Sequence, residues 1–94
     1  MIPVKICGIT NLEDAMYVSR AGAKAIGFIF YNKSPRCITI DKASKISKEI
    51  NNMIKIGVFV NPHLDFVNEA IKKVPIDIIQ FHGNESDAFI NSFN

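Results

Sequence analysis

The stretch KAIGFIFYNKSPR, from Lys24 to Arg36, carries the clearest fold signal in the chain. Residues 24–31 are rich in Ile, Phe and Tyr and predict a strand. Apolar side chains occupy both faces of this strand, as in a parallel sheet that is covered on both sides. A polar loop that contains one proline follows at residues 32–36. The stretch therefore indicates a buried strand that ends in a polar loop.

Three more segments read as strands, at residues 2–6 (IPVKI), 54–60 (IKIGVFV) and 76–81 (IDIIQF). Segments with helical periodicity separate them, so the predicted order is β-α-β-α-β-α-β-α. This alternation implies parallel strands with right-handed helical crossovers. Two architectures fit: an open doubly wound sheet, or the first four βα units of a (βα)8 TIM barrel. The GxGxxG and P-loop patterns are absent, which weakens the nucleotide-binding version.

Residues suited to helix N-termini precede each predicted helix. Thr10 begins a Thr-x-x-Glu capping box, and Asp41 is the expected cap of the second helix. Asn61 precedes a proline at the start of the third helix. Asn84 and Ser86 are both candidates to cap the fourth.

Length and composition predict one globular domain over residues 1–94, with 48% hydrophobic and 21% charged residues. The net charge is +2 and the two signs are interspersed, so we expect neither a nucleic-acid nor a membrane partner. No signal-peptide pattern is evident, and no apolar stretch approaches the roughly 18 residues of a membrane span. A soluble, cytoplasmic protein is the expectation.

The cysteines Cys7 and Cys37 lie 30 residues apart and outside any CxxC pair. A disulfide is disfavoured in a reducing compartment. His63 and His82 supply no recognisable metal-ligand spacing, so no metal site is predicted. His63 is expected at the surface, and Cys37 is expected to be a packing residue.

Polar side chains follow the predicted strands at their carboxyl ends. Cys7 follows the first strand, Arg36 the second and Asn61 the third, while Gln80 and His82 close the fourth. In both candidate architectures, ligands bind at the carboxyl ends of parallel strands. The sequence therefore predicts a ligand site at this edge of the sheet.

The chemistry of these residues leaves two interpretations open. Lys5 and Cys7 project from the same strand face, and a nearby ammonium favours a thiolate that can act as a general base. A packed thiol is the plainer interpretation of Cys7. Arg36 is either a bidentate ligand for a carboxylate or phosphate, or a solvated surface arginine. His82 either donates to a substrate oxygen or makes a structural hydrogen bond.

Four motifs, KICGIT, GFIFYNKSPR, IGVFVN and QFHG, follow one another along the chain, and together they touch every predicted strand. Together they resemble the phosphoribosylanthranilate isomerase family of tryptophan biosynthesis, whose members are (βα)8 barrels. The resemblance implies that Cys7 is the general base and that Arg36 anchors the anthranilate carboxylate. Gln80 and His82 match positions at the mouth of the active site and are implied to bind substrate.

The implied reaction is the Amadori rearrangement of N-(5′-phosphoribosyl)anthranilate to 1-(2-carboxyphenylamino)-1-deoxyribulose 5-phosphate. The resemblance implies no cofactor and no metal, because the iminium intermediate is itself the electron sink. The substrate is thus a phosphorylated small molecule.

The match to the family is partial. A complete barrel takes about 200 residues or more, and the family's catalytic acid, an aspartate on a later strand, has no counterpart here. The phosphate-binding loops of later strands are also missing. We therefore expect a half-barrel that is inactive alone and that needs a complementary C-terminal half or associates with itself. The alternative is a non-catalytic half-barrel that serves as a binding or self-associating module.

Overall fold

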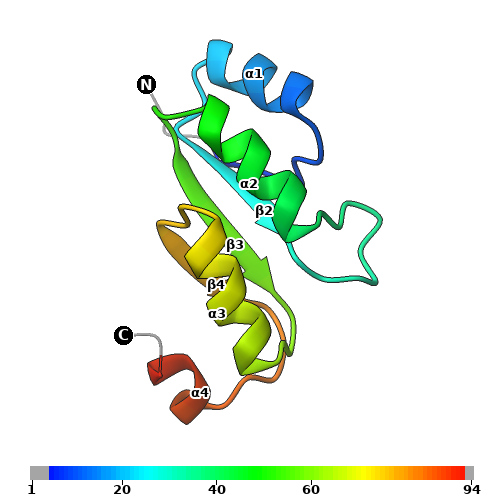
Figure 1. Ribbon diagram of the computed structural model, residues 1–94, viewed down its shortest axis with the longest axis vertical. Coiled ribbons are helices and arrows are strands. Elements are labelled where there is room, and N and C mark those ends of the chain that lie inside the picture. Colours follow the sequence, from blue (N-terminus) through cyan, green and yellow to red (C-terminus); the bar gives the residue numbers. More distant parts are fainter. Residues whose placement is uncertain (1–4, 93–94) are drawn as a thin grey trace.

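The computed structural model describes residues 5–92, which form four βα units (Figure 1). The strands are β1 (Lys5–Cys7), β2 (Ala25–Ile29), β3 (Ile54–Phe59) and β4 (Ile78–Phe81). The helices are α1 (Leu12–Arg20), α2 (Ile40–Glu49), α3 (Leu64–Lys73) and α4 (Asp87–Asn91).

The strand order distinguishes the two predicted architectures. All strand pairs are parallel, and the order in the sheet is β1-β2-β3-β4. Each crossover therefore moves one strand further in the same direction, as it does in a (βα)8 barrel. In a doubly wound sheet the order would reverse at a switch point. The half-barrel prediction is confirmed, and the doubly wound alternative is wrong.

The main core lies between the sheet and the helices. Ile26 and Phe28 of β2 and Phe59 of β3 are fully buried and pack in one cluster with residues of α2 and α3, including Ala43 and Val67. Figure 1 shows α2 and α3 running side by side over β2 and β3. Alternate side chains of a strand point to opposite faces, so this cluster uses only half of the strand positions.

Aromatic rings extend the same core. Ring contacts link Phe30 to Phe59 at a centroid separation of 5.2 Å, Phe59 to Phe81 at 6.1 Å, and Phe81 to Phe89 at 5.5 Å. This series joins Phe30, the residue that follows β2, to β3, β4 and α4. Phe28, Phe30 and Phe59 are therefore core residues.

The other face of the sheet, here called the inner face, carries the alternate strand positions. A small cluster of Ala25, Ile56 and Val58 is buried there, with Cys7 packed against it. Ile78 lies on the same face and is 49% exposed. In a complete barrel these positions would fill the interior in layers. The inner face is therefore the barrel lining of this half.

The strand predictions agree with the structure to within a few residues. Residues 24–31 contain β2, 54–60 contain β3, and 76–81 contain β4. The predicted strand at 2–6 overlaps β1, although residues 2–4 lie outside the described residues. Within residues 5–92, no helix is long and apolar enough to cross a membrane.

Two of the predicted helix caps lie one or two residues away from the observed N-cap residues. Asn11, not Thr10, caps α1, because the Asn11 side chain accepts a hydrogen bond of 2.7 Å from the backbone amide of Asp14. Thr39, not Asp41, caps α2. Asparagine and threonine both have a side-chain oxygen that can accept from a free helix amide at the N-cap. The conformation of the loop before each helix therefore determines which of the neighbouring polar residues is the N-cap.

The predicted cap at Asn61 is wrong. Asn61 has a φ of 45°, and His63 is the N-cap of α3 without a side-chain bond. Of the two candidates for α4, Ser86 is the cap and accepts from Phe89 N at 3.1 Å. Asn84 instead donates its backbone amide to the Asn61 side chain.

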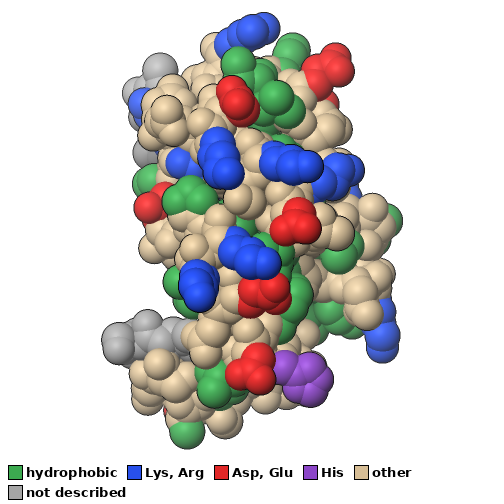
Figure 2. All heavy atoms as spheres, in the orientation of Figure 1, with side chains coloured by type: hydrophobic (Ala, Val, Ile, Leu, Met, Phe, Trp, Pro, Cys, Tyr) green, Lys and Arg blue, Asp and Glu red, His purple; other side chains and the backbone are tan. Residues whose placement is uncertain are grey.

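Charges of both signs are mixed over the surface that carries the helices. Figure 2 shows Lys and Arg side chains interspersed with Asp and Glu on this face. No single-sign stripe appears on it, which agrees with the small net charge of +2.

Candidate active site at the carboxyl ends of the strands

The predicted site residues come from two loops and two strands at one edge of the sheet. Cys7 is the last residue of β1, and Arg36 lies in the loop between β2 and α2. Gln80 belongs to β4 and His82 follows it directly. These four residues are called the strand-end site below. The structure joins them as two neighbouring groups, one around Cys7 and one around Gln80.

The thiol of Cys7 occupies space that a glycine leaves free on β2. Cys7 and Gly27 are register partners, and a β-carbon on Gly27 would lie 2.7 Å from Cys7 Sγ. No real β-carbon contact is that short, so any side chain at Gly27 would displace the thiol. Cys7 is half-buried and not disulfide-bonded. The thiol is thus held on the inner face with partial access to solvent.

Arg36 lies against the residue that follows Cys7. A β-carbon on Gly8 would lie 2.5 Å from Arg36 Cδ, and Gly8 has a φ of +84°, a conformation that glycine adopts without strain. Gly8 therefore turns the chain out of β1 and makes room for the arginine stem. The guanidinium belongs to an exposed residue next to the thiol-bearing strand end.

The loop that carries Arg36 is shaped by local hydrogen bonds. The backbone amide of Arg36 donates to Ser34 Oγ at 3.1 Å, and Ser34 N donates to the carbonyl of Tyr31 at 3.0 Å. A serine hydroxyl that accepts from a nearby backbone amide is a common turn element. Ser34 thus orders the loop.

Gln80 forms the second group and links the two edges of the sheet. Lys5 Nζ on β1 donates to Gln80 Oε1 at 3.2 Å, and Gln80 Nε2 contacts His82 Nε2. Lys5 and Gln80 are 75 positions apart in the sequence. The contact spans the inner face from the first strand to the fourth, so the sheet is curved as a barrel wall must be. Sequence reasoning placed Lys5 beside Cys7 but missed this contact.

The segment after His82 is clamped to the end of β3. The backbone amides of Asn61 and Gly83 donate to the two carboxylate oxygens of Glu85, at 2.6 and 2.9 Å. Asn61 Oδ1 in turn accepts from Asn84 N at 2.7 Å. Glu85 was not predicted as a site residue, and no local pattern signals it, because its partner lies 24 positions away. The clamp fixes the direction in which the chain leaves β4.

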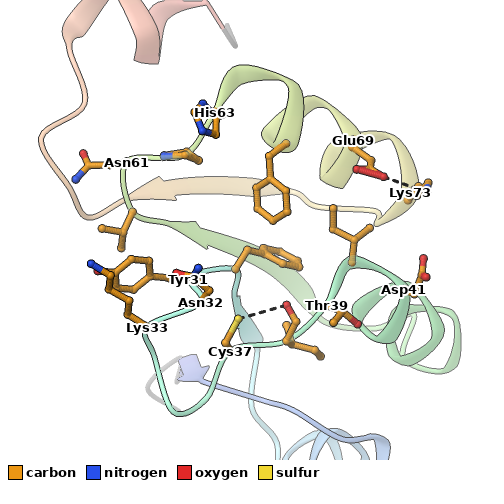
Figure 3. Close-up of a pocket in the computed structure, with 16 residues that line it drawn as sticks. Tyr31, Asn32, Lys33, Cys37, Thr39, Asp41, Asn61, His63, Glu69 and Lys73 are labelled. Atoms are coloured by element: carbon orange, nitrogen blue, oxygen red, sulfur yellow. Dashed lines mark hydrogen bonds and ion pairs between the residues drawn. The ribbon is translucent and has the colours of Figure 1, made fainter.

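A cavity of about 750 Å³ lies nearby, between the loop before α2, the turn before α3, and these two helices (Figure 3). Phe30, Ile38 and Phe66 form apolar parts of its wall, while Lys33 and His63 contribute polar groups. The four residues of the strand-end site do not line it. The strand ends are the candidate site, because parallel barrels bind ligands there.

Cys37 and His63 both line this cavity and are both exposed. The surface position predicted for His63 is confirmed. The expectation that Cys37 is a packing residue is wrong, because its loop runs over the surface and leaves the residue open to solvent. Within residues 5–92, no three His, Cys, Asp or Glu side chains converge as metal ligands.

The fold and the strand-end residues define a class of protein: one half of a parallel (βα)8 barrel with candidate ligand-binding residues at its carboxyl edge. Comparison with solved structures agrees. Phosphoribosyl anthranilate isomerase from Thermotoga maritima superposes with a TM-score of 0.92 at 41% identity, over 98% of this chain and 45% of that chain. The isomerase from Thermus thermophilus gives 0.90 at 32% identity, over 97% and 46%.

The model of the N-(5′-phosphoribosyl)anthranilate (PRA) isomerase family matches residues 4–94, and the chain belongs to this family. The enzyme of Geotalea uraniireducens is 47% identical over 95 residues, which cover all of this chain and 47% of that protein. The enzyme of Neisseria gonorrhoeae is 47% identical over 94 residues, covering 99% and 45%. The chain thus spans about half the length of the curated relatives it matches.

Proposed function

We propose that the chain supplies the N-terminal half of a PRA isomerase active site, for an aldose–ketose type isomerisation in tryptophan biosynthesis. One observation carries the proposal: the Arg36 side chain packs against Gly8, the residue that follows Cys7, at the barrel edge where catalytic groups are placed. Family membership adds the substrate class. A related isomerase was solved with reduced 1-(o-carboxyphenylamino)-1-deoxyribulose 5-phosphate, a phosphorylated compound of the same class.

In the proposed reaction, an acid protonates the ribose ring oxygen while the anthranilate nitrogen forms a C1′–N iminium, which opens the ring. The Cys7 thiolate then removes the C2′ proton. The electron pair of that C–H bond forms a C1′–C2′ double bond and neutralises the iminium nitrogen. The resulting enolamine gains a proton at C1′ and loses the C2′ hydroxyl proton, which gives the ketone.

The remaining strand-end residues bind and orient the substrate in this proposal. Arg36 donates two parallel hydrogen bonds to the anthranilate carboxylate, a geometry that the guanidinium fork suits. Gln80 and His82 donate to or accept from substrate oxygens on the inner face. The acid and the phosphate-binding loops come from a complementary C-terminal half, so the chain alone is inactive. The reaction takes place in the cytoplasm.

A second candidate function is a non-catalytic half-barrel that associates with itself. The exposed inner-face residues Ile54 (45%) and Ile78 (49%) favour it, since paired copies would bury both. Within the described residues β1 and β4 each pair with one strand, and such edges promote association. Two half-barrels facing one another would cover these edges.

Reconstitution tests the catalytic proposal. The chain is assayed for consumption of N-(5′-phosphoribosyl)anthranilate, first alone and then with the separately expressed C-terminal half of the Geotalea uraniireducens relative. We expect no turnover by either half and measurable turnover by the mixture. A stable one-to-one complex without turnover would count against the catalytic proposal. Light scattering of the chain alone separates the two candidates, because a clean monomer argues against self-association.

A further inference from the structure

The contact between Lys5 and Gln80 has a consequence for His82. Lysine carries only donors, so at 3.2 Å from Lys5 Nζ the atom of Gln80 must be the carbonyl oxygen. The amide nitrogen of Gln80 then faces His82 Nε2. That nitrogen carries two protons and has no acceptor capacity.

The opposite orientation of the amide is disfavoured. It would place an NH2 group against the Lys5 ammonium and leave two donors facing one another. The interaction of Lys5 with the carbonyl oxygen is also charge-assisted, which makes it stronger than the neutral contact at the other end of the amide. Lys5 therefore fixes the direction of the Gln80 amide, and that direction dictates the role of His82 Nε2.

We propose that Lys5 is a positioning residue that sets the tautomer of His82 through Gln80. His82 Nε2 accepts from the Gln80 amide, so the neutral ring carries its proton on Nδ1. The Nδ1–H group is then the donor that His82 offers at the strand-end site, toward an acceptor oxygen of the ligand. Only this last role rests on the proposed function, because the tautomer is a property of the chain without substrate.

The tautomer is measurable by NMR of the chain labelled with 15N-histidine, at about pH 8.5, well above the pKa of histidine in model peptides. Two-bond nitrogen–proton correlations show which ring nitrogen carries the proton. The chain has only two histidines, and the exposed His63 serves as an internal reference in every spectrum. Lys45→Met, in α2 and away from the inner face, is the matched control for removing an exposed lysine.

In the unaltered chain we expect the His82 proton on Nδ1. Lys5→Met frees the amide to rotate, so His82 should shift toward the Nε2–H form that histidine prefers in water. Lys5→Arg keeps a donor-only cation and should retain the Nδ1–H form. Gln80→Glu presents only acceptors, so His82 should donate from Nε2, and the tautomer should invert. Lys45→Met should leave the spectrum of His82 unchanged.

An Nε2–H form of His82 in the unaltered chain would overturn the proposal without any variant. Retention of the Nδ1–H form in Lys5→Met would overturn the role of Lys5. If Lys5→Met does not fold, the unaltered chain and Gln80→Glu still decide, since an uninverted tautomer in Gln80→Glu contradicts the donor assignment. Failure of reconstituted activity with the expected tautomers would count against the proposed function alone.

Discussion

The sulfur of Cys7 lies over the α-carbon of Gly27, its register partner on the neighbouring strand, where a β-carbon would approach to 2.7 Å. The position of the thiol therefore depends on the absence of a side chain one strand away. A single methyl group at Gly27 tests how strictly the proposed base must be placed.

Gly27→Ala should displace the Cys7 thiol and lower kcat/KM of the reconstituted enzyme by about 100-fold, since a displacement of about 1 Å can have this effect. Overpacking should also lower the free energy of unfolding by about 1–3 kcal/mol. Steady-state kinetics and denaturant unfolding of the same preparation measure the two effects.

The matched control is Gly57→Ala on β3. A methyl group there would meet the tip of the Ile76 side chain at 3.0 Å, on the helix side of the sheet and away from Cys7. We expect it to lower stability to a similar degree but to leave kcat/KM within about threefold. Equal losses of kcat/KM in both variants would contradict the prediction, because the loss would then not depend on displacement of the Cys7 thiol.

Cys7→Ala removes the proposed base. A positioned general base contributes about 10²–10⁴-fold, so kcat of the reconstituted enzyme should fall by at least about 100-fold while KM changes little. Cys37→Ala removes the other, exposed thiol and should be neutral. A Cys7→Ala enzyme with more than a tenth of the original kcat would contradict the assignment.

Arg36→Lys keeps the charge but loses the fork that binds a carboxylate through two parallel hydrogen bonds. Hydrogen bonds to charged groups contribute about 1.5–3 kcal/mol, so KM should rise by about tenfold or more. The same substitution at Arg20, an exposed residue in the last turn of α1, is the control. An unchanged KM in Arg36→Lys would place Arg36 outside the substrate site.

The sequence predicted the strands and the edge of the sheet where the candidate site residues lie, because both depend on local features. Apolar runs reveal buried strands, and parallel strands bring their carboxyl ends together. The contacts that order the site were not predictable in this way. Gln80 meets Lys5 across 75 positions, and Asn61 meets Glu85 across 24.

Two of the errors, at Asn61 and Cys37, have the same origin. Asparagine is a residue type that often caps helices. The Asn61 side chain, however, accepts a hydrogen bond from the backbone amide of Asn84, and Asn61 adopts a positive φ. Cys37 has the chemistry of a packing residue, but the loop that holds it lies at the surface. In both cases tertiary contacts of the loops override a local preference.

Asp77 gives a stability prediction that does not depend on the proposed function. Its Oδ2 accepts from the backbone amide of Lys55 at 2.8 Å, and Lys55 is only 6% exposed. Asp77→Ala leaves this amide without its acceptor, which should lower the free energy of unfolding by about 1–3 kcal/mol. Denaturant titration measures it, with exposed Glu49→Ala as a control expected to stay within about 0.5 kcal/mol.

Ile78 tests whether copies of the chain associate through the inner face. It is 49% exposed at the β4 edge of the sheet, and a charge there would have to be desolvated when two inner faces meet. Ile78→Lys should therefore shift any dimer of the chain to monomer. Light scattering over a concentration series measures the shift, with Ile71→Lys on α3, whose native residue is 37% exposed, as the control. If Ile71→Lys dissociates the dimer and Ile78→Lys does not, association runs through the helices instead.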